Sequence, residues 1–314
     1  MRNQVPAAIL LSLLLLAALG YVLASYGGGS QPLSSGAASR GSNYLVANYN
    51  SSIGMIPNVP GGHTYYVYSD NFLAALALKG SDDPTLRAIS SNITSTDARM
   101  LSAVPHPTSQ YQVISSTNGT FFTSNDYVLA RLGSAVIETT LNNGTTPLSP
   151  VSYVDVAFLD ALYLHRVGLQ KSAVGDFTLG AKLYDGVGFV DKAFTQGQYQ
   201  TYKLALYDYV GKVLGAVLPS NLESNLLKLQ DPDGGFYIGY DAHFTPNGTD
   251  TNTATTSLAI LALGTPGAKA QPSPYLIPIF VSATAAVVAA EFFLLRGRSR
   301  PTLQTPHEKR LIFT

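Results

Sequence analysis

Apolar residues recur at helical spacing along the middle of the chain. Apolar positions three and four residues apart predict helices over several segments: 70–79, 125–140, 154–167, 199–214, 221–229 and 253–263. Asp82 and Asp83 before Pro84 predict one more helix, reaching Asn92, because acids and proline favour a first helical turn. Strand patterns are shorter: 111–114 and 120–123 predict a hairpin, and 236–244 predicts a second β segment. The middle is therefore predicted to be mainly α.

Two longer apolar runs lie near the ends of the chain. Residues 7–25 carry no charge and predict a signal peptide over 1–25 or an uncleaved signal anchor, and both alternatives stay open. Residues 275–295 predict a transmembrane helix, with Glu291 near its end. Arginines follow at positions 296, 298 and 300. By the positive-inside rule, the tail 296–314 is expected in the cytoplasm and the middle domain outside the cell membrane.

Shifts in composition divide the rest. Residues 26–42 are rich in Gly and Ser and predict a linker, and 265–274 predicts a Pro/Gly stalk. An extracellular helical domain is therefore expected over 43–264. The N-x-[ST] acceptor sequences for glycosylation all fall in this part, which agrees with an exterior domain. They are Asn50, Asn92, Asn118, Asn143 and Asn247.

Charge and cysteine content narrow the function classes. Only 12% of the 314 residues are charged, and 46% are hydrophobic. Residues 40–270 hold 13 Lys/Arg against 17 Asp/Glu, so this part repels phosphate backbones and no nucleic-acid partner is expected. Cys is absent, which removes disulfides, cysteine nucleophiles and thiolate zinc sites.

The most distinctive local sequence is Gln230-Asp-Pro-Asp-Gly-Gly-Phe236, which follows one predicted helix and precedes another. Pro232 stops the first helix, Asp233 and Gly234 favour a tight turn, and Gln230 is placed to bind free backbone groups at the helix end. The Leu/Ala pattern of 73–78 returns at 258–263. Such echoes indicate repeated helical hairpins, or arise by chance between Leu/Ala-rich helices.

This motif resembles the repeat signature of α/α-toroid proteins: terpenoid cyclases, protein prenyltransferase β-subunits, and pectate-lyase-like and glucuronyl-epimerase-like domains. The resemblance covers about 40 residues clearly and implies an α/α-toroid-like domain, possibly incomplete, with short β-hairpins. It implies a fold more than an activity. Asp-x-Asp-Asp, the cyclase motif, is missing, as is the Cys of the prenyltransferase zinc site. Of the named families, those that act on saccharides remain as possible relatives.

A saccharide enzyme needs two carboxylates flanking one cleft. The candidates are Asp70 and Asp233 as acid and base, with His243 as a third member. Competing structural roles are a helix N-cap for Asp70, a turn for Asp233 and a solvated loop for His243. Further ligand-binding candidates are the nearby acids and the tyrosines that would form an aromatic platform: Tyr65, Tyr66, Tyr68, Asp241 and Asp250.

Cofactor motifs are weak. Residues 186–191 lack the spacing and the preceding strand of a dinucleotide-binding loop. Asp231 and Asp233 alternate like calcium ligands, but position twelve of that pattern is Ala242, which leaves only an irregular site with Asp241 as an alternative. We therefore expect no cofactor and no resident metal.

Two readings of function follow from these patterns. The first is a membrane-anchored cell-surface protein whose exterior domain has a binding or structural role in the cell envelope. Its partners would be the lipid bilayer and glycans or other envelope proteins. The second is a cell-surface glycan-active enzyme: a glycoside hydrolase, polysaccharide lyase or epimerase. The enzyme requires Asp70 and Asp233 to converge in one cleft, whereas the binding protein does not.

Overall fold

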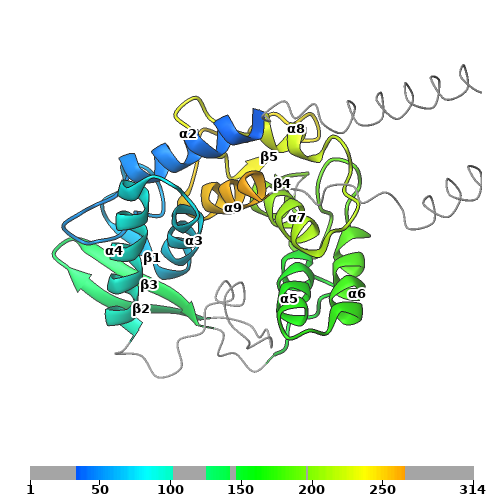
Figure 1. Cartoon of the computed structure of the whole chain (residues 1–314), viewed down its shortest axis with the longest axis horizontal. Helices are drawn as coiled ribbons and strands as arrows, with labels where there is room; N and C mark the ends of the chain where they lie inside the picture. Colours follow the sequence, from blue (N-terminus) through cyan, green and yellow to red (C-terminus); the bar gives the residue numbers. More distant parts are fainter. Residues whose placement is uncertain (1–32, 102–124, 142–145, 196, 266–314) are drawn as a thin grey trace, which may run out of the picture. The chain divides into compact units, whose positions relative to one another are not determined.

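The computed structural model describes residues 33–101, 125–141, 146–195 and 197–265. The described part is mainly α (Figure 1). Its helices are α2 Leu33–Ala47, α3 Tyr68–Lys79, α4 Pro84–Leu101, α5 Val154–Arg166, α6 Gln170–Ala181, α7 Thr201–Leu214, α8 Leu222–Leu227 and α9 Thr253–Gly264. No helix among these residues is long and apolar enough to cross a membrane. The runs 7–25 and 275–295, the predicted stalk beyond Thr265 and the tail lie outside the described residues.

Helices α3, α9, α7 and α5 form a row of neighbours with their N-terminal ends on the same side. At these ends, the backbone N–H of Thr253 in α9 donates to the carbonyl of Asn58 at 3.0 Å, in the segment leading to α3. The N–H of Thr201 in α7 donates to the carbonyl of Ile238, also at 3.0 Å, in the segment leading to α9. At the opposite ends, Lys212 Nζ of α7 donates to the carbonyl of Ala262 in α9 at 2.7 Å. These helices therefore run parallel.

A second helix packs on each member of the row: α4 on α3, α6 on α5, α8 on α7 and α2 on α9 (Figure 1). Small residues make the approaches close. A Cβ on Gly41 of α2 would stand 2.8 Å from the Ile260 side chain of α9. A Cβ on Gly180 of α6 would stand 2.6 Å from the Phe158 ring of α5. Glycine at these positions lets the paired helices pack more tightly than a side chain would permit.

Recurring turns connect the outer helices to the row. Antiparallel bridges join Asn50 to Met55 after α2, Tyr184 to Phe189 after α6, and Gln230 to Phe236 after α8. Each turn contains a glycine with positive φ: Gly54 at 80°, Gly186 at 102° and Gly234 at 102°. After α4, the corresponding connection falls in 102–124, outside the described residues. The described chain thus repeats one unit of inner helix, outer helix and bridged turn.

Gln230 binds backbone groups, but in the turn and in α2 and not at the end of α8 as the sequence predicted. Its Nε2 donates to the carbonyls of Ala37 and Gly234, both at 2.9 Å. Its Oε1 accepts from Arg40 Nη2 at 2.5 Å. The side chain therefore binds the turn after α8 to helix α2, near the opposite end of the sequence.

Replacing Gly234 by alanine should destabilise the domain more than the same change at Gly186. Both glycines have φ of 102°, a conformation that costs an L-residue about 1–2 kcal/mol. A Cβ on Gly186 meets no atom within 4 Å, whereas a Cβ on Gly234 would collide with the carbonyl oxygen of Arg40. We expect a loss of about 1 kcal/mol for Gly186→Ala and of about 2–3 kcal/mol for Gly234→Ala in urea unfolding. Equal losses would show that α2 yields freely to the added methyl group.

The predicted helix over 125–140 is wrong. Strands β2 Asn125–Leu132 and β3 Ala135–Leu141 pair there in an antiparallel hairpin, and β3 also pairs in parallel with β1 Tyr65–Val67. The reason lies in the residues of β3, where Val136, Ile137 and Thr139 favour an extended chain. Gly133, with φ of 63°, supplies the turn.

Two other expectations change in the structure. Residues 33–42 of the predicted 26–42 linker are helical, because α2 buries Ala37 against α9 despite its Gly/Ser content. The predicted strand over 236–244 shortens to β5 Gly239–Tyr240, which pairs with β4 Tyr199–Gln200. The predicted hairpin of 111–114 and 120–123 lies outside the described residues. The other predicted helices are present. They are α3, α4, α5, α7, α8 and α9, which were predicted over 70–79, 84–92, 154–167, 199–214, 221–229 and 253–263, and α4 runs on to Leu101.

Candidate functional site

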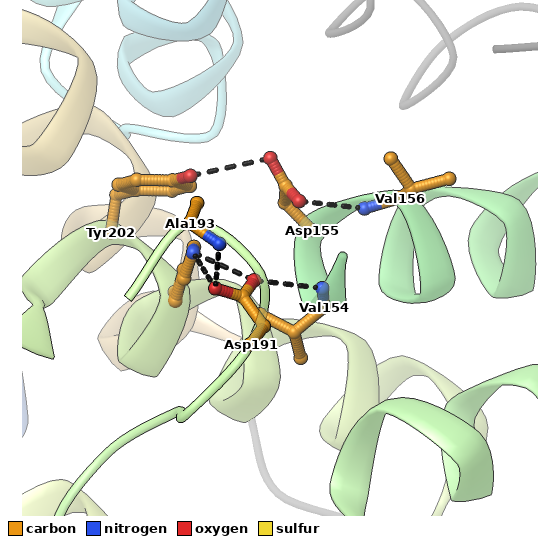
Figure 2. A network of polar contacts seen from close by, with 7 residues as sticks. Val154, Asp155, Val156, Asp191, Ala193 and Tyr202 are labelled. Carbon is orange, nitrogen blue, oxygen red and sulfur yellow. Dashed lines mark hydrogen bonds and ion pairs between the residues drawn. The ribbon is translucent and has the colours of Figure 1, made fainter. Parts of the chain in front are cut away.

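A buried ion pair joins the N-terminal ends of α5 and α7. Lys203 Nζ lies 2.8 Å from both carboxylate oxygens of Asp191. The Lys203 side chain is 2% exposed and that of Asp191 is fully buried. Asp191 also accepts from the backbone N–H of Val154 at 3.1 Å and of Ala193 at 3.0 Å (Figure 2). Asp191 therefore satisfies a backbone donor at the start of α5, and Lys203 neutralises its charge.

Beside this pair, Asp155 and Tyr202 form a second polar contact. The Tyr202 hydroxyl donates to Asp155 Oδ2 at 3.2 Å, and the Val156 N–H donates to Oδ1 at 3.0 Å (Figure 2). Burial raises the pKa of the Asp155 carboxyl, while the charge of Lys203 acts in the opposite direction. Both Asp155 and Tyr202 are partly exposed. A carboxyl group and a phenol that are partly exposed can exchange hydrogen bonds with ligand hydroxyl groups.

Asp70 lies in the first turn of α3 but is not its N-cap. The N-cap residue is Val67, which has no side-chain capping bond, so the predicted capping role of Asp70 is wrong. Asp70 is 7% exposed and accepts a long hydrogen bond, 3.5 Å, from Ser69 Oγ. Burial raises its pKa to about 7, and the nearby charge of Glu138 on β3 acts in the same direction. A carboxyl group with this pKa exchanges protons near neutral pH.

Asp233 has the turn role that the sequence also allowed. Its Oδ1 accepts from the backbone N–H of Gly235 at 2.8 Å, and Asp231 Oδ1 accepts from the N–H of Asp233 at 3.1 Å. The turn packs on Arg40 and Tyr44 of α2, whereas Asp70 faces Glu138 of the sheet. Asp70 and Asp233 therefore have different hydrogen-bond partners, and neither carboxyl group is among those that shift the pKa of the other.

The remaining polar candidates also lie in loops. His243 and Asp250 are exposed. Asp241 Oδ1 accepts from the backbone N–H groups of His243 at 2.8 Å and of Thr245 at 2.9 Å. These bonds lower the pKa of Asp241. Asp241 closes a turn, and His243 contributes its backbone to that turn.

The predicted tyrosine platform does not form. Tyr65 is 56% exposed, but Tyr66 is fully buried and Tyr68 is 3% exposed. Adjacent residues of a strand point to opposite faces, which separates Tyr65 from Tyr66. The hydroxyl of Tyr66 accepts from Asn50 Nδ2 at 2.8 Å. Tyr66 and Tyr68 are therefore part of the protein interior.

The glycosylation candidates differ in access. Asn50 is held by Tyr66 and, through Oδ1, by the backbone N–H of Ser52 at 3.1 Å, so its amide is occupied in the fold. Asn92 on α4 and Asn247 in the loop after β5 are exposed. Asn118 and Asn143 lie outside the described residues.

Within the described ranges, no group of three or more His, Cys, Asp or Glu side chains is arranged to hold a metal ion. The predicted alternative of a cation bound by Asp231, Asp233 and Asp241 is thus not formed. Asp231 instead accepts a hydrogen bond from the Tyr237 hydroxyl, which lowers its pKa.

Sequence reasoning missed the cluster of Asp155, Asp191, Tyr202 and Lys203. One signal was available in the sequence. Asp155 and Lys203 lie near the starts of the predicted helices 154–167 and 199–214. Comparison with known proteins adds no relative, because no family model, curated protein or solved structure matches this chain.

Proposed function

We propose that this chain is a membrane-anchored cell-surface protein whose exterior domain has a binding or structural role in the cell envelope. The observation that carries this proposal is that Asp70 and Asp233 have different hydrogen-bond partners and that neither shifts the pKa of the other. The apolar runs and the arginines after 295 support the anchoring and the orientation.

The α/α-toroid-like fold is part of this proposal. Its support is the parallel row of α3, α9, α7 and α5, each with an outer helix, and the repeated bridged turns. The motif from Gln230 to Phe236 is one of these turns. Helical hairpins that repeat side by side along a curved row are the arrangement from which a toroid is built.

Single cysteines provide the test of anchoring and orientation, because the chain has none of its own. Val217 is 97% exposed, so Val217→Cys should react with a membrane-impermeant maleimide on intact cells. Ser299→Cys, in the predicted tail, should react only after the cells are permeabilised. Both variants should stay with the membrane after an alkaline carbonate wash. Labelling of Ser299→Cys on intact cells, or release of the protein by the wash, would contradict the proposal.

A glycan-active enzyme is the second candidate, and one observation favours it. Asp70 is buried, and burial together with the charge of Glu138 raises its pKa to about 7, which is the range of a general acid at neutral pH. Incubating the full chain with purified cell-surface polysaccharide separates the candidates. The binding protein retains the polymer unchanged. A hydrolase or lyase releases new chain ends, an epimerase changes the configuration of sugar residues in the intact polymer, and either activity should be lost in Asp70→Asn.

A further inference from the structure

A pocket of about 360 Å³ lies between α2, α3 and α9. It is at the C-terminal ends of α3 and α9, opposite to the cluster of Asp155 and Lys203. Its apolar wall includes Leu76 of α3, Leu86 of α4, and Ile260 and Leu261 of α9. Gly80 and Gly264 also line it, and a Cβ on either glycine would meet no atom within 4 Å. The volume is within the range of pockets that bind small ligands.

The lining chemistry favours an apolar occupant. No residue of the wall carries a formal charge. Three of its four hydroxyl side chains have backbone partners: Ser42 Oγ donates to the carbonyl of Ala38 at 3.1 Å, Thr265 Oγ1 donates to that of Leu261 at 2.6 Å, and Ser81 Oγ accepts from the N–H of Asp83 at 3.1 Å. The fourth, Ser39, is exposed to solvent. The surface that remains is largely aliphatic, and a charged ligand would lose hydration there without gaining a partner.

The position of the pocket indicates where that occupant comes from. Helix α2 runs antiparallel to α9, because Tyr44 contacts Thr251 while Ala38 lies with Leu261 at the pocket. The start of α2 and the end of α9 are therefore at the same end of the domain. Tyr275, where the second apolar run begins, follows Thr265 by ten positions. Ten extended residues reach at most about 35 Å, so an anchor at 275–295 would tether this end of the domain within that distance of the bilayer.

We propose that the pocket binds one acyl chain of a bilayer lipid. The inference rests on the proposed membrane anchoring, which brings the pocket within reach of the outer lipid layer. An acyl chain matches the aliphatic wall and needs no polar partner inside it. Insertion would hold the end of the domain formed by α2 and α9 against the membrane surface.

Photo-crosslinking tests this binding. The full chain is reconstituted in phosphatidylcholine vesicles in which a diazirine group marks the lipid acyl chain, and it is then irradiated and mapped by mass spectrometry. We expect adducts on peptides of α3 and α9 that line the pocket, as well as on the run 275–295. In the double variant Gly80→Leu and Gly264→Leu, new side chains occupy the pocket, and its adducts should fall at least fivefold.

Gly175→Leu is the matched control. Gly175 is a glycine of helix α6 whose added Cβ also meets no atom within 4 Å, but it lies away from the pocket. Its adducts should equal those of the unchanged chain. Adducts on 275–295 without adducts in the pocket, or pocket adducts that persist in the double variant, would overturn the inference alone. Absence of adducts from 275–295 would overturn the membrane anchoring as well.

Discussion

Replacing Lys203 by methionine should lower the free energy of unfolding by about 3–5 kcal/mol. The substitution leaves Asp191 fully buried without its cation, and a buried carboxylate that loses its partner charge is strongly destabilising. The measurement is urea unfolding of the full chain in detergent, followed by circular dichroism. Asp191→Asn on the Lys203→Met background should recover part of the loss, because the amide has no charge to neutralise.

Lys192→Met provides the matched control for this effect. Lys192 is an exposed lysine whose Nζ lies 5.8 Å from the centre of the Tyr153 ring. An exposed contact of this kind contributes less than about 1 kcal/mol. If Lys203→Met lowers the free energy of unfolding no more than Lys192→Met does, the buried Asp191 carboxylate does not need the charge of Lys203. The ion pair then does not stabilise the packing of α5 against α7.

Asp70→Asn should stabilise the protein, and the gain should depend on pH. The pKa of Asp70 is about 7 in the fold and about 4 in an unfolded chain. Between these values the folded form binds a proton that the unfolded form has lost. Stability of the unchanged protein therefore falls as pH rises, by up to about 1.4 kcal/mol per unit from this group. The variant has no such loss, so its advantage should be largest above pH 7 and vanish near pH 4.

Thermal unfolding of both proteins from pH 4 to 8 checks this expectation. Asp160 and Asp208, each with a pKa raised by burial to about 6, remain in both proteins, so the difference isolates position 70. A constant difference across the range would mean that folding does not change the pKa of Asp70. If Asp70→Asn also ends glycan turnover while the fold gains stability, the carboxyl acts on the substrate and not on the fold.

Helix positions were predictable where the spacing of apolar residues and the flanking turn residues indicated the same helix. Residues 154–167 and 253–263 carry both signals, and α5 and α9 lie there. The β2–β3 hairpin was not predicted, because the apolar residues of 125–140 also fit helical spacing. The β-branched residues of β3 and its pairing with β1 and β2 favour strands instead. Helix α2 was missed because its Gly/Ser content suggested a linker. Its stability comes from α9, far away in the sequence.

The site was harder to predict than the fold. Residues 184–189 have the same bridged turn as Gln230 to Phe236, but the sequence suggested only a poor dinucleotide loop. Conversely, Asp233 attracted attention for the motif around it, while its carboxylate serves the turn. Asp191 and Lys203 are ordinary charged residues twelve positions apart in the sequence, and the segment between α6 and α7 places Asp191 against Lys203 and the start of α5. A pair of this kind has no characteristic residue spacing that would mark it in the sequence.

The pairing of α2 with α9 determines when this domain finishes folding during synthesis. The hydrogen-bonded pair Tyr44 and Thr251 is separated by 207 residues, so translation at about 5–20 residues per second delays their meeting by roughly 10–40 s. Until α9 emerges, α2, α3 and α7 lack the helix that all of them contact. Nascent chains that stop before residue 253 should therefore remain open to proteases and chaperones, and protection should appear only when the last helix of the domain has been made.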